Sequence, residues 1–178
     1  MNISLIISVI GPDRPGLVEQ ISATVTRAGG NWEDSRMIQL AGQFAGMVQV
    51  VLPREKLDAL REELESVGGE SLRVDVIHTD APPENTSGPP PRRILLEVVG
   101  QDRTGIVAEI SRTLAEAGVN VAELATDCRS APWSGDRMFE THAVLEIPSD
   151  DGFDPDALLE RIEEIAGDLM VEIKSEER

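Results

Sequence analysis

The sequence predicts an α+β protein made of two β-α-β-β-α-β units, and three observations lead to this prediction. A Gly-x-Asp-Arg-x-Gly turn occurs twice, at residues 11–16 and at residues 100–105. Around each copy, apolar residues switch between the period of two typical of strands and the three-to-four-residue spacing of helices. A proline-rich stretch lies between the repeats. We therefore expect a domain over residues 1–79, a semi-rigid linker over 80–92 and a second domain over 93–178.

Each element of the first half follows from its own pattern. Leu5, Ile7 and Val9 alternate with serines and predict a strand. Apolar residues then recur at helical spacing after the glycine turn, with Pro15 near the first helical position, where proline is tolerated. The predicted elements are a strand over 3–10, this helix up to Gly29-Gly30, strands over 31–40 and 44–52, a helix between Pro53 and Gly68-Gly69, and a strand around 72–76.

The second half repeats the same order. Ile94, Leu96 and Val98 take the places of Leu5, Ile7 and Val9 in the repeat. Phe139 matches Phe44 only if about six residues are inserted ahead of it, and we assign them to residues 130–136 because insertions are tolerated in loops. A helix through Leu158 and a last strand through Val171 complete the second unit.

Composition limits the function. The chain has 33 acidic and 16 basic residues, a net charge of −17. Nucleic-acid binding depends on Lys and Arg that neutralise phosphates, so this charge opposes direct binding to DNA and to anionic membranes. The single cysteine, Cys128, excludes an internal disulfide and fits a reducing cytoplasm. No apolar stretch reaches the roughly 18 residues that a membrane span needs. We expect a soluble cytoplasmic protein.

Catalytic and metal-ligating patterns are not found in the sequence. The histidines are His78 and His142, and the strand alternation predicts that His142 faces solvent. Cys128 has no histidine near it in sequence, so a packing role is favoured over a reactive one. One cysteine and two distant histidines give no zinc-site spacing. We therefore predict a protein without catalytic activity, cofactor or metal.

The repeated turn is the best candidate for a binding site. A glycine-rich turn that opens a helix leaves backbone N–H groups without intrahelical partners, and these donors suit a carboxylate. Asp13 and Asp102 within the turns would repel a phosphate but could accept from an ammonium group, so a zwitterion is favoured. The alternative is that both aspartates cap their helices and that the glycines provide backbone freedom.

Two asparagines extend this candidate site. Asn31 and Asn120 follow the first helix of each half at equivalent positions. We expect each first loop to lie beside the start of the second strand, so that Asp13 and Asn31, and likewise Asp102 and Asn120, share a small polar cavity. The asparagine amide offers donors and an acceptor to a zwitterion. The alternative is that both asparagines serve turns.

These residues resemble a known family. Gly-x-Asp-Arg-x-Gly after a strand, with Ala28-Gly29-Gly30-Asn31 or Ala117-Gly118-Val119-Asn120 after the helix, is similar to the ACT domain, a ferredoxin-like regulatory module that binds amino acids. The resemblance covers nearly the whole chain. The tandem arrangement, with Ala131-Pro132-Trp133-Ser134-Gly135 and Phe139, further resembles the glycine cleavage system transcriptional repressor family.

The resemblance implies where a ligand binds. In ACT domains the ligand typically sits at an interface between two units, held by the first loop and the opening of the second strand. Some ACT effector sites have Asn where this chain has Asp13 and Asp102, and Thr104 replaces Pro15, so the two sites need not be equivalent. The implied ligand-binding residues are Gly11, Asp13, Arg14, Pro15, Gly16 and Asn31, with Gly100, Asp102, Arg103, Thr104, Gly105 and Asn120 in the second unit.

The resemblance also implies a function. We expect an amino-acid-responsive regulatory protein that contacts a DNA-bound transcription activator and not DNA itself, with glycine or serine as the first candidate ligands. The partly apolar second sheet face, with Ile6, Ile10, Leu95 and Val99, is a candidate surface for homo-oligomerisation or partner contact, or for packing between the units. The alternative is a scaffold or oligomerisation module built of ACT units that binds no ligand.

Overall fold

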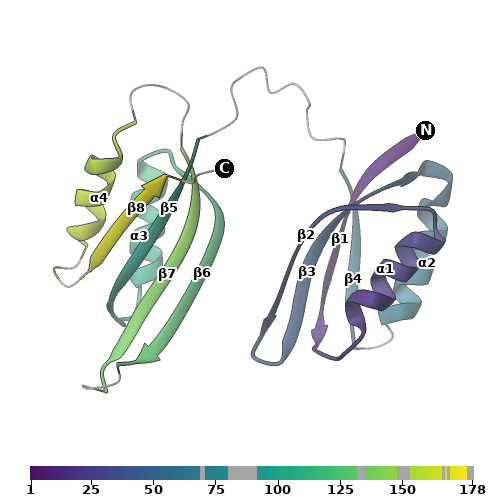
Figure 1. The fold of residues 1–178 in the computed structure, drawn as a ribbon, viewed down its shortest axis with the longest axis horizontal. Coiled ribbons are helices and arrows are strands. Elements are labelled where there is room, and N and C mark those ends of the chain that lie inside the picture. The colour runs from purple at the N-terminus through teal and green to yellow at the C-terminus, as the bar shows by residue number, and fades with distance from the viewer. Residues whose placement is uncertain are drawn as a thin grey trace. The chain divides into compact units, whose positions relative to one another are not determined.

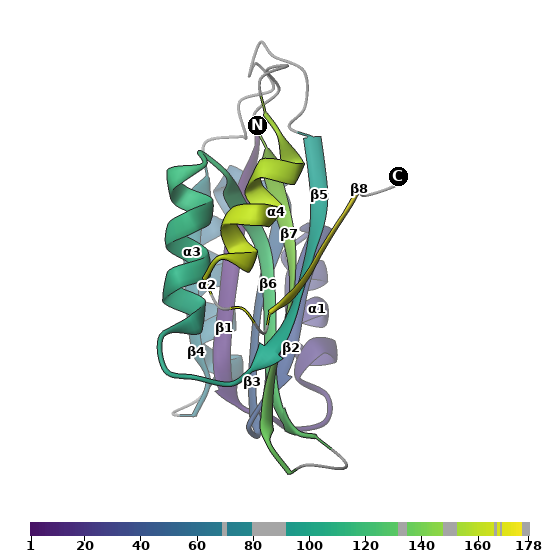
Figure 2. The same cartoon turned by 90° about the vertical axis from the view of Figure 1, so that its left-hand side faces the viewer.

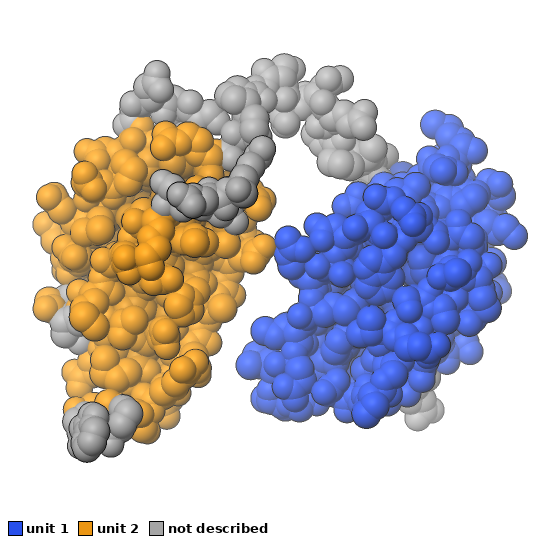
Figure 3. Space-filling model, in the orientation of Figure 1, with its two compact units in different colours: residues 1–86 blue, residues 87–178 orange. Residues whose placement is uncertain are grey.

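The computed structural model describes residues 1–68, 71–79, 92–131, 135–147, 153–165, 167 and 169–175 (Figure 1). The chain divides into two compact units, Met1–Thr86 and Ser87–Arg178, here called unit 1 and unit 2 (Figure 3). The proposed linker over 80–92 lies outside the described residues except for Arg92, with which the first strand of unit 2 begins.

Both units have the predicted β-α-β-β-α-β order. In unit 1 the elements are β1 (Asn2–Pro12), α1 (Leu17–Arg27), β2 (Asn31–Leu40), β3 (Gln43–Pro53), a 3₁₀ turn (Arg54–Lys56), α2 (Leu57–Gly68) and β4 (Arg73–Thr79). In unit 2 they are β5 (Arg92–Gln101), α3 (Ile106–Glu116), β6 (Asn120–Ser130), β7 (Arg137–Ile147), α4 (Pro155–Glu163) and β8 (Met170–Ser175). The α+β prediction is confirmed in each half.

Each unit has two layers. The four strands of unit 1 form an antiparallel sheet in the order β2-β3-β1-β4, and those of unit 2 form one in the order β6-β7-β5-β8. Two helices cover one face of each sheet; Figure 2 shows α3 and α4 in front of the sheet of unit 2. The face of each sheet that carries no helix is called its outer face below. Among the described residues, no helix has both the length and the apolar character needed to cross a membrane.

Each unit has its own apolar core between its sheet and its helices. Alternation along β1 directs Leu5, Ile7 and Val9 inward, where all three are buried. They pack with residues at helical spacing on α1, such as Ile21 and Val25. The equivalent core of unit 2 is formed by Ile94, Leu96, Val98, Ile110, Leu114, Phe139, Leu145, Leu158 and Ile162, among others. Strand and helix periodicity in the sequence therefore identified both cores.

The first helix of unit 1 begins later than the sequence predicted. The N-cap residues are Gly16 of α1 and Gly105 of α3, with φ of 89° and 93°. This left-handed conformation is readily adopted by glycine and strained for most other residues. Pro15 therefore precedes the N-cap and is not at the first helical position. Pro155 does take that position in α4, behind an Asp154 side chain that accepts from the backbone N–H groups of residues 156 and 157.

Gly11 in β1 gives a stability prediction. A Cβ atom added there would lie 2.6 Å from the Ser71 carbonyl oxygen and 3.0 Å from the Leu72 side chain. Because the backbone of Ser71 would have to move, we expect Gly11→Ala to destabilise unit 1 by about 1–3 kcal/mol. The measurement is urea unfolding, with hydrogen exchange as the probe that reports the stability of each unit separately. Gly167→Ala, with nothing within 4 Å of the added atom, is the control and is expected to change stability by less than about 0.5 kcal/mol.

Candidate functional site

The two repeated turns occupy equivalent places in their units. Each follows the first strand, ends on a glycine N-cap and is anchored to the hairpin that joins the second and third strands. In unit 1 the Asp13 backbone N–H donates to the Gly42 carbonyl at 2.9 Å, and in unit 2 the Asp102 N–H donates to the Arg137 carbonyl at 2.8 Å. The predicted repeat of the loop is therefore also a repeat of its backbone geometry.

The aspartates do not cap these helices. The N-caps are glycines, which have no side chain to accept from the first-turn N–H groups of α1 and α3. Asp102 instead forms an ion pair with Arg137, whose Nε lies 3.1 Å from Asp102 Oδ2. The pKa of Arg137 is raised by a hydrogen bond with the Cys128 side chain and by the charge of Asp102. The alternative that both aspartates cap their helices is therefore wrong. Contact of either aspartate with a ligand stays a prediction.

The arginines of the two turns have different partners. Arg14 Nη2 donates to the neutral Gln20 Oε1 at 3.0 Å. In unit 2 the equivalent Arg103 binds the carboxylate of Glu109 through both terminal nitrogens, with Nη1 3.1 Å from Oε1. The hydrogen bond from Arg103 lowers the pKa of Glu109 below its usual value. The Arg14 guanidinium thus keeps a charge that this partner does not neutralise, whereas Arg103 is paired with an anion.

The asparagines lie at the opposite end of each sheet from the loops. Asn31 pairs with Val51 of β3, whereas Pro12, just before Asp13, pairs with Gln43 at the other end of β3. The separation is the length of β3 between Gln43 and Val51, roughly 27 Å at about 3.4 Å per residue. The expected shared cavity within one unit is therefore wrong. Because β1 and β2 both run antiparallel to β3, β2 begins at the end where β1 begins.

Unit 2 separates its two groups in the same way. Asn120 pairs with Glu146, at the end of β7 beside Arg93, whereas Gln101, just before Asp102, pairs with Met138 at the other end. Met138 and Glu146 lie near opposite ends of β7, so almost the whole length of this strand separates Asn120 from the loop. Asp102 and Asn120 therefore do not share a cavity within this unit either.

Both asparagines make side-chain contacts at the start of their strands. Asn31 Nδ2 donates to Glu33 Oε1, and Asn120 Nδ2 donates to Glu146 Oε2 at 3.0 Å. Glu146 also accepts from Arg93 Nη2 at 2.9 Å, and the hydrogen bonds from Asn120 and Arg93 lower the pKa of its carboxyl group. In these contacts the two asparagine side chains bind glutamate carboxylates and not the backbone of a turn. They do not support the alternative that both asparagines serve turns.

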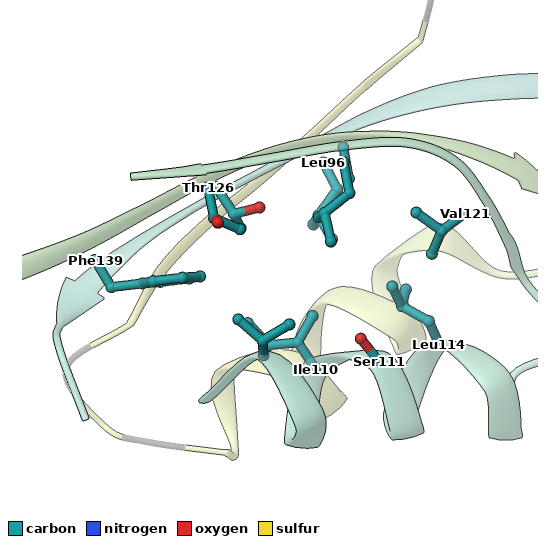
Figure 4. Close-up of a pocket in the computed structure, with 11 residues that line it drawn as sticks. Leu96, Ile110, Ser111, Leu114, Val121, Thr126 and Phe139 are labelled. Atoms are coloured by element: carbon teal, nitrogen blue, oxygen red, sulfur yellow. The ribbon is translucent and has the colours of Figure 1, made fainter. Parts of the chain in front are cut away.

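The hollow between α3 and the sheet of unit 2 is not a ligand site. Leu96, Ile110 and Phe139 are among its lining residues, and Figure 4 shows these side chains pointing into it. Its volume is about 20 Å³, which is room for about one water molecule and not for an amino acid. None of the twelve predicted site residues lines it. It is a gap in an apolar layer.

The other groups considered in the sequence have surface positions. Cys128 is a free, exposed thiol. His142 is exposed on the outer face of unit 2, with Nε2 3.1 Å from Glu140 Oε1, which confirms the predicted direction of its side chain. Among the described residues, no group of three or more His, Cys, Asp or Glu could hold a metal ion.

The insertion predicted in unit 2 falls in the hairpin between β6 and β7. In unit 1 this hairpin turns through Ala41-Gly42, whereas in unit 2 the strand register ends at Ser130 and Arg137. The longer connection, residues 131–136, agrees with the extra residues inferred from the repeat. Residues 132–134, part of the motif that suggested the repressor family, lie outside the described residues.

Comparison with known proteins gives consistent matches. Family models described as ACT domain match residues 4–76 and residues 94–167. The glycine cleavage system transcriptional repressor of Escherichia coli is 26% identical over 146 residues, which cover 82% of this chain and 74% of that protein. A UPF0237 protein of Methanopyrus kandleri is 40% identical over 74 residues, covering 40% of this chain and 81% of that protein. The crystal structure of an unknown protein from Galdieria sulphuraria matches 98% of this chain and 99% of its own, with a TM-score of 0.84 and 28% identity.

Proposed function

Because the chain belongs to the ACT domain family, with one ACT domain in each half, we propose that it is a regulatory protein that responds to a small amino acid. The observation that carries the proposal is the loop of unit 1. There, a glycine N-cap leaves the first-turn N–H groups of α1 without a side-chain acceptor, beside Arg14 and Asp13. The amides and the guanidinium suit a carboxylate, and the Asp13 carboxylate suits an ammonium group. A free amino acid has both groups.

The two loops are not proposed to be equal. In unit 2 the same residue types neutralise one another, because Arg103 pairs with Glu109 and Asp102 pairs with Arg137. A ligand carboxylate would have to compete with Glu109 for the Arg103 guanidinium. We therefore assign ligand binding first to Gly11, Asp13, Arg14, Pro15 and Gly16, and give Gly100, Asp102, Arg103, Thr104 and Gly105 the weaker site.

Asn31 and Asn120 remain part of the proposal in a different form. A single unit places its loop and its asparagine at opposite ends of the sheet, so one unit cannot bring both to one ligand. A ligand held by both groups would need two ACT domains, from one chain or from two chains. Asn31, and Asn120 with Glu146, would then contact the ammonium or carboxylate group of a ligand held by another loop.

How the protein would exert its regulatory effect is proposed from its similarity to the Escherichia coli repressor and from its net charge. The repressor of Escherichia coli is a glycine cleavage system regulator by name, and we propose a comparable role in transcription for this chain. With a net charge of −17, the chain would act through a protein, such as a transcription activator, and not on DNA. Ligand binding would favour one arrangement of the domains and so change the surface offered to that protein. The alternative is a scaffold of ACT domains that binds no ligand.

The test is calorimetric titration of the full chain with glycine, then serine, then the remaining amino acids. We expect saturable binding of at least one of them, lost in Asp13→Ala and largely kept in Asp102→Ala. Circular dichroism of each variant checks that it is folded. A folded chain that binds no amino acid of the panel would refute the sensor proposal and favour the scaffold.

A further inference from the structure

We infer that the loop of unit 2 contains its own ligand. The Glu109 carboxylate and the Arg137 guanidinium occupy the places that the carboxylate and ammonium groups of an amino acid take at the unit 1 loop. This assignment rests on the function proposed for unit 1, and it makes unit 2 the half of the chain that does not respond to free amino acids.

Glu109 directs its carboxylate back to the start of α3. Its backbone N–H donates to the Gly105 carbonyl at 3.0 Å, so the residue belongs to the first turn of the helix. A Cβ atom added to the glycine N-cap would lie 3.9 Å from Glu109 Oε1. A carboxylate at a helix N-terminus is stabilised by the first-turn N–H groups and by the helix dipole. Glu109 therefore holds a carboxylate where a free carboxylate would bind.

Arg103 binds this carboxylate as it would bind that of a ligand. Nη1 lies 3.1 Å from Oε1, and Nη2 donates to Oε2. Two parallel bonds from one guanidinium are the typical form of arginine–carboxylate recognition. Only 36% of the Arg103 side chain and 34% of the Glu109 side chain are exposed, so salt screens this pair less than a fully exposed one. The hydrogen bond from Arg103 also lowers the pKa of Glu109, which keeps the carboxyl group ionised at neutral pH.

Gln20 has the same place in unit 1 without the charge. It is the fourth residue after the N-cap, as Glu109 is in unit 2, and its backbone N–H donates to the Gly16 carbonyl at 2.9 Å. Its amide nitrogen would lie 3.9 Å from a Cβ atom added to Gly16. The position of the side chain is thus repeated, but Gln20 brings no carboxylate. The Arg14 guanidinium is left for the carboxylate of a ligand.

Arg137 supplies the positive charge at the loop of unit 2. Its Nε lies 3.1 Å from Oδ2 of Asp102, the carboxylate that would otherwise accept from an ammonium group. The Arg137 carbonyl also accepts the backbone N–H of Asp102. In unit 1 the residue that accepts the equivalent N–H is Gly42, 2.9 Å from the Asp13 nitrogen. Glycine has no side chain, so this position offers no cation to Asp13.

The two side chains together present both charges of a zwitterion to the unit 2 loop. Because Glu109 and Arg137 are part of the chain, they are present at a high effective concentration whatever the level of free amino acid. A free ligand would have to break both ion pairs to bind. We expect the unit 2 loop to keep one conformation with and without amino acid, so that a population shift on binding comes from unit 1.

Arg103 also connects this loop to the second helix of unit 2. Its Nη2 donates to the Ile165 carbonyl at 3.4 Å. Ile165 follows Glu164, the C-cap of α4, where carbonyl groups lack intrahelical donors and a cation is favourable. Glu109 thus fixes the side chain that links the start of α3 to the end of α4. Removing its carboxylate is expected to loosen both helix ends.

The test removes the resident carboxylate and supplies a free one. In Glu109→Ala we expect hydrogen exchange, measured by mass spectrometry, to be faster by about tenfold or more in peptides of the loop and of the end of α4, as hydrogen bonds to a charged group are lost. Sodium acetate is expected to reverse most of this change and to reach a plateau, because its carboxylate binds Arg103. Sodium chloride at the same ionic strength is expected to have no such effect, and acetate is expected to leave unit 2 of the wild-type chain unchanged.

Glu116→Ala is the matched control. Glu116 is also on α3 and pairs with Arg161 of α4 at 2.8 Å, but it is the last residue of the helix and lies far from the glycine turn. Acetate is expected to protect this variant no more than chloride does. Circular dichroism checks folding. If Glu109→Ala is unfolded, Glu109→Gln replaces it, because unit 1 folds with glutamine at the equivalent position.

A double variant, Glu109→Ala with Arg137→Ala, tests the positive charge. Glycine supplies both charges and acetate only one, so we expect glycine to restore protection of the unit 2 loop at a lower concentration than acetate. Equal effects of the two would overturn the assignment of Arg137 as the substitute for an ammonium group.

Two results would overturn the role of Glu109. One is unchanged exchange in Glu109→Ala, and the other is a loss of protection that acetate reverses no better than chloride. These measurements report on unit 2 alone. A wild-type chain that binds no amino acid would therefore refute the function proposed for unit 1, whereas rescue by acetate would still establish Glu109 as the resident ligand of unit 2.

Discussion

Replacing Ile7 by alanine is expected to destabilise unit 1 strongly while unit 2 keeps its stability. Ile7 is fully buried on the central strand β1 and packs in a core formed only by unit 1 residues. Truncating such a side chain removes its transfer free energy and leaves a cavity, at a cost of about 2–5 kcal/mol. This is a large part of the about 5–15 kcal/mol that stabilises an ordinary domain, and a unit of this size lies towards the low end.

The matched variant is Leu96→Ala. Leu96 is 1% exposed, occupies in β5 the position that Ile7 occupies in β1, and packs in the core of unit 2. We expect it to destabilise unit 2 and to leave unit 1 unchanged. Hydrogen exchange measured by mass spectrometry assigns the loss of protection to peptides of one unit or the other. If either variant removed protection from both units together, the two cores would be shown to unfold as one cooperative system.

The second large effect concerns the loop arginines. We expect Gln20→Glu to weaken amino-acid binding by tenfold to a hundredfold, because it gives Arg14 the carboxylate partner that Arg103 has in Glu109. A hydrogen bond to a charged group contributes about 1.5–3 kcal/mol, and the ligand carboxylate would have to compete for the guanidinium. The measurement is calorimetric titration with the amino acid that the wild-type chain binds.

The reciprocal change is the control for this prediction. Glu109→Gln gives Arg103 the neutral partner found in unit 1, so we expect it to create or strengthen binding by unit 2 and to raise the number of ligands bound per chain. Because Arg103 lowers the pKa of Glu109, their ion pair contributes stability that is present above the ordinary glutamate pKa and is lost as the pH falls through the lowered pKa. The variant has no carboxyl group at residue 109 and loses this contribution. Unchanged affinity in Gln20→Glu, in a chain that does bind an amino acid, would show that Arg14 does not contact the ligand carboxylate.

Much of the fold could be predicted because its signals are local. Alternation in β1 and β5, helical spacing in α1 and α3 and glycines behind the helices each depend on a few neighbouring residues. The sequence repeat strengthened these assignments, because the same pattern predicts the same element in both halves. The start of α1 was predicted too early, near Pro15, because proline is tolerated at the first helical position. In the structure Gly16 is the N-cap and the helix begins after it.

The candidate site was predicted less completely because it depends on strand register. The sequence identified the loops that contain Asp13 and Asp102, and in the structure both loops are hydrogen-bonded to equivalent hairpins. It could not show that Asn31 lies at the far end of the sheet, which follows from the antiparallel pairing of β2 with β3. Nor could it show that Arg103 has a charged partner and Arg14 a neutral one.

The sequence by itself determined that this protein consists of two ACT domains, each with its own aliphatic core and its own glycine loop. The tertiary structure alone decided which side chains meet: the pairing of Asp102 with Arg137, the pairing of Arg103 with Glu109, and the separation of Asn31 from Asp13. The physical reason is that backbone periodicity is set within a few residues, whereas pairing register is set by contacts between segments far apart in the chain.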